Sequence, residues 1–251
     1  GRIRRYYNRG SVVVYPPVDT DFYRPADDRR APDPCFLAVS ALVPYKRLDV
    51  AIEACRRVGA PLKIVGSGPE LARLARRAGP EVEFLGWRAD EEVRALYRSA
   101  TAVVLPGVED FGMVPVEAQA CGCPVVALAE GGSLETVRDG ETGVLVPEGS
   151  PEALADGLAR ARTLGFDRTA IRAHALQFSR DRFLAGFKAA VDDAVKATAK
   201  LPSAPRNVPP SPQQADREDA EAAASGRTAK LPSAPRNVPP SSQQADREDE
   251  Q

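Results

Sequence analysis

The sequence predicts a doubly wound α/β domain, in which a parallel sheet of the Rossmann type is covered by helices on both faces. Three observations predict it. Short apolar runs recur along the middle of the chain, most of the consecutive residues in each run are apolar instead of every second one, and segments with helical spacing separate the runs. Strands that are buried on both faces have this pattern, because neither face meets water. The predicted strands are residues 35–40, 62–66, 82–86, 102–105, 124–128 and 143–146.

Helices are predicted between these strands. Residues 49–58 and 90–99 place apolar side chains at helical spacing, and in the second segment Val93, Leu96 and Tyr97 share one face. Ligands of such folds bind outside the carboxyl ends of the strands. We therefore expect a site built from the loops after Ser40, Val65, Leu85, Leu105 and Leu128.

Polar residues and prolines indicate where the helices begin. Asp90 and Ser150 have side chains typical of N-caps. Pro69 and Pro115 suit the first helical position, where a proline sacrifices no hydrogen bond. We accordingly predict a helix over residues 115–121 and further helices from Ser150 to about residue 197.

Composition divides the 251 residues into three parts. Residues 1–34 are basic and aromatic at first and then Pro-rich. Residues 35–197 form the predicted ligand-binding domain. Residues 198–251 contain a segment, 198–219, that returns as 228–249 with one change. The repeat has no apolar face that stacking could bury, so we predict a disordered tail.

Composition also argues against several functions. The net charge of −1 gives no basic field that favours nucleic acid, and no apolar run is long enough to span a membrane. The four cysteines form no C-x-x-C pair, and His174 is the only histidine, so we expect no metal site. We interpret the cysteines as buried reduced thiols and His174 as a structural residue. The chain begins with Gly1, and we expect a fragment of a longer cytoplasmic protein.

The strongest candidate site follows the strand that ends at Leu105. Gly112 permits a tight turn into a helix. The N–H groups of Phe111, Gly112, Met113 and Val114 are then free, and we expect them to face the end of the sheet. A helix N-terminus of this kind favours anions, above all phosphate.

Two glutamates, Glu109 and Glu117, flank this predicted phosphate cradle. A carboxylate repels phosphate, but it accepts hydrogen bonds from hydroxyl groups such as those of sugars. A nucleotide sugar offers both chemical groups in one ligand. The sequence therefore favours a nucleotide-sugar site over a helix with merely solvated acids.

An ordered set of motifs resembles one enzyme family. Glu109 and Glu117 match the E-x7-E motif of the retaining GT-B glycosyltransferases of group 1, family 4. The resemblance covers roughly residues 1–190 and implies the C-terminal, donor-binding half of a two-domain fold. It also implies that residues 1–34 are the end of the preceding domain and an interdomain linker. Pro-Tyr-Lys-Arg and Glu-Asp-Phe-Gly are most similar to the mannosyltransferase-type branch. The matching segments, in family order, are residues 39–49, 64–70, 84–86, 117–126, 131–132 and 135–137.

The resemblance assigns roles to individual residues. Lys46, with Arg47, would neutralise the donor diphosphate as the leaving group develops charge. Glu109 would meet hydroxyls of the transferred hexose, and Glu117 would accept both ribose hydroxyls. Many relatives have Arg where Ala41 stands, so a second phosphate cation is either missing here or supplied by Arg47.

Other predicted donor contacts come from loops. The loop after Gly86, with Arg88, would meet the base. Gly66 and Gly68 superficially resemble a dinucleotide fingerprint, but Leu71 stands where the third glycine would be. A tight turn at the edge of the donor pocket fits these two glycines better. The backbone from Phe111 to Val114, through Gly112 and Met113, would hold the sugar and phosphate.

The resemblance implies a hexosyltransferase whose donor half is this chain. The donor would be a GDP- or UDP-hexose, with mannose the expected sugar, used as a substrate with no cofactor and no metal. The acceptor would be an unknown glycan or lipid-linked molecule, and the upstream domain could associate with the inner face of a membrane. Asp19-Thr20-Asp21 has the spacing of metal-dependent glycosyltransferases of another fold, but it follows Pro16-Pro17 in the predicted linker.

Two other readings remain. The chain could be an inactive nucleotide-sugar-binding module with an interaction tail. It could also be a nucleotide-sugar epimerase or dehydrogenase, but the sequence has no Tyr-x-x-x-Lys pair for that chemistry.

Overall fold

The computed structural model describes residues 2–26 and 33–199. The chain divides into two units, Gly1–Thr198 and Ala199–Gln251, and the following concerns the first. The predicted disordered tail, residues 198–251, lies outside the described residues except for Thr198 and Ala199, which are helical rather than disordered.

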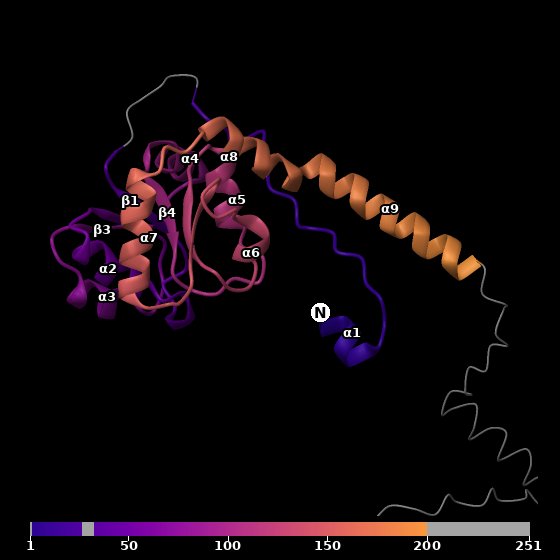
Figure 1. The fold of residues 1–251 in the computed structure, drawn as a ribbon, viewed down its shortest axis with the longest axis horizontal. Helices are drawn as coiled ribbons and strands as arrows, with labels where there is room; N and C mark the ends of the chain where they lie inside the picture. Colours follow the sequence, from indigo (N-terminus) through magenta and orange to yellow (C-terminus); the bar gives the residue numbers. More distant parts are fainter. Residues whose placement is uncertain (1, 27–32, 200–251) are drawn as a thin grey trace, which may run out of the picture. The chain divides into compact units, whose positions relative to one another are not determined.

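Six strands alternate with helices along the described chain. The strands are β1 (Phe36–Val39), β2 (Leu62–Val65), β3 (Val82–Gly86), β4 (Ala102–Leu105), β5 (Val125–Leu128) and β6 (Gly143–Val146). All pair in parallel, in the order β3-β2-β1-β4-β5-β6 (Figure 1). The chain winds outward from β1 to one edge and then from β4 to the other, which confirms the predicted doubly wound sheet.

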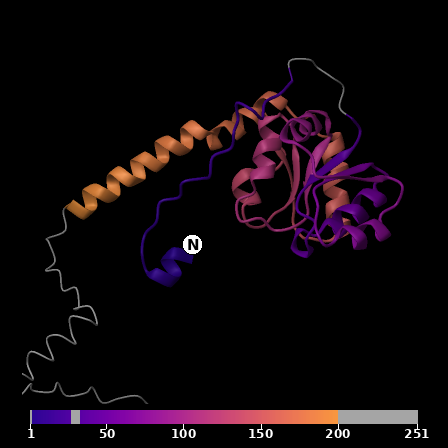
Figure 2. The same cartoon turned by 180° about the vertical axis from the view of Figure 1, so that it is seen from behind.

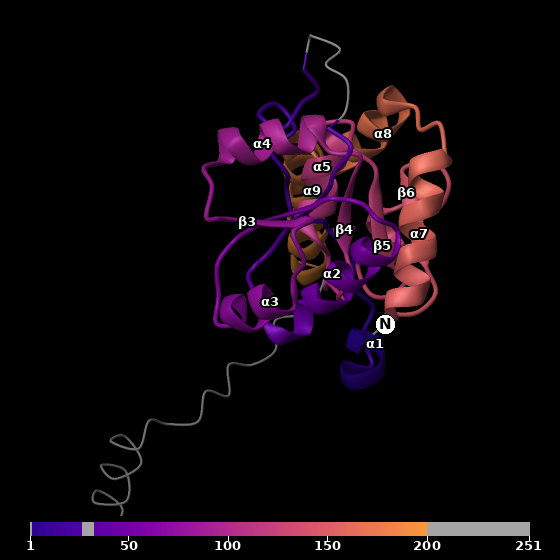
Figure 3. The same ribbon diagram turned by 90° about the vertical axis from the view of Figure 1, so that its left-hand side faces the viewer.

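Helices cover both faces of this sheet (Figure 3). The helices are α1 (Arg2–Tyr7), α2 (Leu48–Arg57), α3 (Leu71–Arg77), α4 (Asp90–Ser99), α5 (Met113–Ala120), α6 (Ser133–Thr136), α7 (Pro151–Thr163), α8 (Arg168–Ala175) and α9 (Arg180–Ala199), with 3-10 turns η1 (Pro44–Lys46) and η2 (Leu176–Phe178). The buried clusters place α2, α3 and α7 on one face and α4, α5 and α8 on the other.

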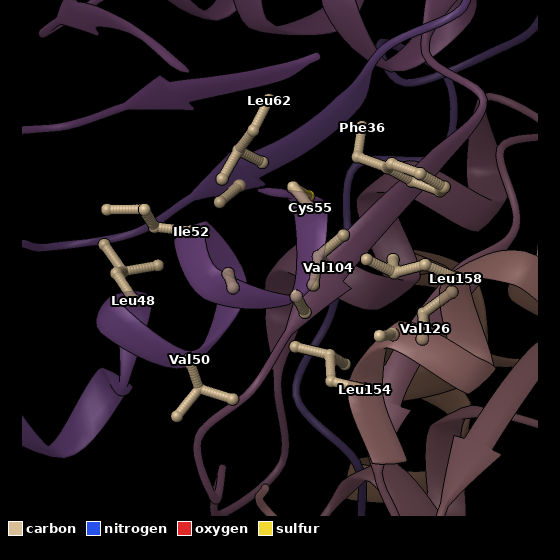
Figure 4. Close-up of a cluster of buried hydrophobic side chains, with 14 of the residues drawn as sticks. Phe36, Leu48, Val50, Ile52, Cys55, Leu62, Val104, Val126, Leu154 and Leu158 are labelled. Atoms are coloured by element: carbon tan, nitrogen blue, oxygen red, sulfur yellow. The ribbon is translucent and has the colours of Figure 1, made fainter. Parts of the chain in front are cut away.

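The apolar core on the α2 and α7 face shows why the strands are apolar runs. Figure 4 shows Phe36, Val104 and Val126 of the sheet on the side of Leu154 and Leu158 of α7. All five side chains are almost completely removed from water. Burial of apolar surface stabilises a fold by about 25 cal/mol per Å². Strand side chains on both faces are therefore selected for apolar character.

Two predicted helix starts, at Pro69 and Pro115, are wrong by two residues. The predicted helix over residues 90–99 is confirmed, and only its predicted N-cap is wrong, by one residue. Pro69 lies in a turn, and α3 begins only at Leu71, after the N-cap Glu70. Asp90 is the first helical residue of α4 rather than its cap; the N-cap is Ala89, whose N–H donates to Glu92 at 3.2 Å.

Pro115 is the third residue of α5, because the tight turn at Gly112 lets the helix begin at Met113. Proline is tolerated there because the first four N–H groups of a helix have no partner within it. The Ser150 cap is confirmed, since its hydroxyl accepts from Ala153 N–H at 3.2 Å.

Part of the predicted linker packs closely against the domain. Val18, Thr20 and Tyr23 are buried. Arg172 of α8 donates to the carbonyls of Thr20 at 3.2 Å and Tyr23 at 3.1 Å, and Arg98 of α4 donates to a further carbonyl of this segment at 2.7 Å. Figure 2 shows the segment from behind. The sequence did not predict that this segment packs against α4 and α8.

Candidate functional site

Two of the predicted site residues, Lys46 and Glu109, lie in the loops that follow β1 and β4, which are neighbours in the sheet. The winding direction reverses between these strands, so their following loops diverge. This switch point is the usual ligand position in doubly wound folds. The loop after β1 carries Lys46, and the loop after β4 carries Glu109.

Lys46 and Glu109 form an ion pair across these two loops, with Nζ donating to Oε1. The side chains are only 17% and 19% exposed, respectively. The turn η1 brings Lys46 to this position, because Arg47 directly after it adopts a left-handed backbone with φ 52°. A non-glycine residue in that conformation is uncommon and is frequently found at functional sites.

Glycines permit the close approach of the loops. A Cβ on Gly107 would lie 2.6 Å from the carbonyl oxygen of Tyr45, so only glycine fits beside the η1 turn. The loop after β5 approaches equally closely, since a Cβ on Gly131 would lie 2.4 Å from the backbone carbonyl oxygen of Glu109. Gly132 N–H donates to that same oxygen at 2.7 Å. The Glu109 backbone is therefore held against the loop after β5.

The helix that follows Glu109 begins with unpaired N–H groups in the described part of the chain. Gly112 has φ 84° and turns the chain into α5. In the described part of the chain, no residue accepts a hydrogen bond from the N–H groups of Phe111, Gly112, Met113 or Val114. These N–H groups are therefore free to donate to a ligand, as predicted from the sequence.

An aromatic cluster packs against this turn. The Phe111 ring stacks on Tyr15 with centroids 5.5 Å apart and meets Phe178 edge-on at 5.4 Å. Tyr15 belongs to the segment that precedes the predicted linker turn. The turn after Glu109 is thus packed against residues from both ends of the described chain.

Glu117 lies in α5 and is held differently. The buried hydroxyl of Tyr97, in α4, donates to Glu117 Oε2 at 3.0 Å. Burial raises the pKa of Glu117, while the hydrogen bond from Tyr97 lowers it and nearby Asp90 raises it. Burial likewise raises the pKa of Tyr97 well above its usual value, so its hydroxyl stays protonated and donates.

The glycines after β2 edge the same end of the sheet. A Cβ on Gly66 would lie 1.9 Å from the Ser40 carbonyl oxygen, and one on Gly68 would lie 2.4 Å from that of Leu42. Leu42 N–H in turn donates to Ser67 at 2.9 Å. The two glycines therefore set the path of the loop that leads to Lys46.

Two predicted contacts are more exposed. The Arg47 side chain is 49% exposed and donates to Gly149 at 3.4 Å, in the loop after β6. Arg88 follows β3 and pairs with Glu92 at 3.5 Å. Neither side chain contacts Lys46 or Glu109 in the described structure. Their assignment to phosphate and base remains a prediction.

Tyr97 is the site residue that sequence reasoning missed. It was interpreted as one apolar member of a helix face with Val93 and Leu96. A usable indication existed, because a tyrosine on an otherwise apolar face must find a partner for its hydroxyl.

Residues set aside in the sequence have structural contacts. The His174 ring lies between the carbonyl of Thr136 at 3.2 Å and Gln177 at 2.8 Å, and burial lowers its pKa. Asp19 accepts from Phe22 N–H at 2.9 Å within a turn. The four cysteines are free and buried, as predicted. Among the described residues, no cluster suited to a metal ion is found.

The fold and this edge of the sheet define a class: a doubly wound domain with a Lys46–Glu109 ion pair at the switch point and a helix terminus with free N–H groups directly after it. A family model for "Glycosyl transferases group 1" matches residues 19–176. The chain belongs to this family.

Named relatives agree with the assignment. The D-inositol 3-phosphate glycosyltransferase of Mycobacterium bovis (strain BCG / Pasteur 1173P2) is 36% identical over 212 residues, covering 72% of this chain and 44% of that protein. This chain thus spans less than half the length of that relative.

Solved structures show the same fold, half of a GT-B enzyme. Sucrose-phosphate synthase from Thermosynechococcus elongatus is 26% identical with a TM-score of 0.66, over 78% of this chain and 56% of that one. Anabaena HepE, solved with UDP and glucose, is 24% identical with a TM-score of 0.60, over 76% of this chain and 57% of that one. In the described part of this chain, no helix is both long and apolar enough to cross a membrane.

Proposed function

We propose that this chain is the donor-binding half of a metal-independent, retaining hexosyltransferase of family 4, which uses a GDP- or UDP-hexose with mannose as the expected sugar. The acceptor is a glycan or a lipid-linked molecule bound by the upstream part of the protein. We place that protein in the cytoplasm, with membrane association through its upstream domain.

One observation carries the proposal. The loop that presents Glu109 meets the loop that presents Lys46 at the switch point, and the free N–H groups of α5 follow within a few residues. Cationic and N–H donors suit a diphosphate, and carboxylates suit sugar hydroxyls. A nucleotide sugar is the ligand class that uses both.

The ion pair suggests the order of events at the site. In the structure, the charge of Lys46 is directed at Glu109. A donor diphosphate competes for Lys46 with more negative charge than one carboxylate carries. Lys46 then moves to the phosphate, and Glu109 is left to accept hydrogen bonds from the hexose. Lys46 stabilises the leaving diphosphate as its charge grows.

A nucleotide titration tests the proposal directly. Trp87 is the only tryptophan, is 75% exposed and lies in the loop predicted to meet the base, so its fluorescence reports binding there. GDP-mannose and UDP-glucose are titrated into the wild-type chain and into Glu117→Ala. Loss of a charged hydrogen-bond acceptor weakens binding by about ten- to a hundredfold. Calorimetry provides a second, label-free affinity.

Glu141→Ala is the matched control, because this glutamate is 69% exposed and pairs only with Arg138 at 3.6 Å. Its affinity should equal that of wild type. The site assignment is wrong if neither donor binds, or if Glu117→Ala and Glu141→Ala bind equally well. Transfer activity in a protein extended upstream would separate an enzyme from the inactive binding module.

A further inference from the structure

The hydroxyl of Tyr97 has a specific placement that packing alone does not require. The side chain is 0% exposed, and its ring lies in the apolar cluster between α4 and the sheet. Its oxygen donates to Glu117 Oε2 at 3.0 Å. Phenylalanine would fill the same space, so the hydroxyl serves Glu117 rather than the core.

The surroundings leave Tyr97 as the determining contact for this carboxylate. In the described part of the chain, no other residue donates a hydrogen bond to Glu117. The titratable groups that face it are Tyr97 and Asp90 of α4, Tyr23 of the linker segment and Cys121 at the end of α5. Asp90 repels the charge of Glu117, and only Tyr97 both favours that charge and fixes an oxygen.

We propose that Tyr97 is a positioning residue for ribose recognition: it holds Oε2 of Glu117 so that Oε1 faces the two neighbouring hydroxyls of a nucleoside. The inference rests on the proposed function, because it assumes that Glu117 meets ribose. A carboxylate has about four lone-pair sites, so one bond from Tyr97 leaves enough acceptors for a vicinal diol. An oxygen that is already fixed loses less freedom when the ligand binds.

Tyr97→Phe tests this in the full chain, because the change removes only the hydroxyl. Uridine diphosphate should bind about three- to tenfold more weakly to the variant. Its 2′,3′-dideoxy analogue, which lacks the diol, should bind wild type and variant equally. Tyr23→Phe is the control, since this ring lies 5.9 Å from that of Tyr97 and its hydroxyl has no described bond to Glu117. Its affinity should stay at the wild-type value.

The pH profile supplies a readout that a packing role would not change. The bond from Tyr97 lowers the pKa of Glu117, so its removal raises that pKa. Binding needs the ionised carboxylate, and the variant should therefore lose affinity at higher pH than wild type. The ratio of wild-type affinity to variant affinity should therefore increase as the pH is lowered from about 8 to about 5.5.

A double variant separates an effect that acts through Glu117 from a general loss of packing around Tyr97. In a Glu117→Ala background, Tyr97→Phe should cause no further loss of uridine diphosphate affinity, because the residue acts through Glu117. A further loss there, or an equal loss for the dideoxy analogue, would overturn the inference and leave the proposed function intact. If wild type binds both nucleotides equally, the ribose assignment of Glu117 fails first.

Discussion

Glu109 and Glu117 are close in the chain, but their side chains are held in opposite ways. Glu109 lies on a loop and pairs with the cation of Lys46 from another loop. Glu117 lies within a helix and accepts from the neutral, buried hydroxyl of Tyr97. An ionic partner can leave for a phosphate, whereas a buried phenol cannot. If the proposed function holds, the hexose end of the site forms when the donor binds, and the ribose end exists beforehand.

Glu109→Gln gives the largest expected effect on this comparison. In a protein extended upstream, transfer should slow by about a hundred- to a thousandfold, as for loss of one polar group that stabilises a transition state. Affinity for free UDP should stay level or increase, because Lys46 loses its competing partner. Glu117→Gln should do the reverse and weaken UDP binding. Steady-state kinetics and calorimetry measure the two quantities, and a loss of UDP affinity in Glu109→Gln would refute the exchange of partners.

Gly107→Ala tests whether the loops must touch. The new Cβ would lie 2.6 Å from the Tyr45 oxygen and 3.0 Å from the Lys46 Cα, both backbone atoms. We expect a loss of about 2 kcal/mol in the free energy of unfolding, measured with denaturant. Gly165→Ala is the control, because nothing lies within 4 Å of its added Cβ. Equal unfolding energies for the two variants would contradict the tight loop contact.

The sequence predicted the sheet and the edge that carries the site, because continuous apolar runs and glycine turns depend on local physics. It assigned Lys46 and Glu109 to one ligand but not to each other, because the pairing depends on how two loops, far apart in the chain, approach through Gly107. Tyr97 was missed because side-chain spacing shows a buried face and not the partner of its one polar atom. The anchoring of Tyr23 depends on Arg172, a residue from a distant helix.

Glu117→Gln should also change stability, by a smaller amount. Burial raises the pKa of Glu117 from 4.5, so the folded protein disfavours its ionised form. This cost in folding free energy is fully present above the raised pKa. It decreases as the pH falls below the raised pKa towards the ordinary value. Glutamine keeps an acceptor for Tyr97 without the charge, so the variant should be more stable at neutral pH by up to about 1 kcal/mol.

Thermal unfolding at about pH 8 and about pH 4.5 measures this difference. The gain should shrink at the acidic value, where Glu117 itself takes up a proton. Glu109→Gln offers the contrast, since its carboxylate has a cationic partner and its loss should not stabilise the fold. A gain that is equal at both pH values would show that burial of charge is not its cause.

Arg47→Gly is expected to have the smallest effect, and it addresses the missing second cation. The left-handed backbone of Arg47, with φ 52°, costs about 1 kcal/mol that glycine does not pay. Glycine also gains freedom in the unfolded chain, which offsets the relief by about 0.5–1 kcal/mol. The bond to Gly149 at 3.4 Å is exposed and contributes little. The free energy of unfolding should therefore change by less than about 0.5 kcal/mol.

UDP affinity is the informative quantity for this variant. If Arg47 supplies the second phosphate cation, Arg47→Gly should bind UDP about threefold more weakly, as expected for one exposed charge, and the deficit should fade in high salt. Arg47→Lys keeps the charge on the same backbone and should retain most of the affinity. Equal UDP affinity for all three proteins would mean that Lys46 and the N–H groups of α5 hold the diphosphate alone. The hexose end of the site would then depend on the one cation that Glu109 already occupies.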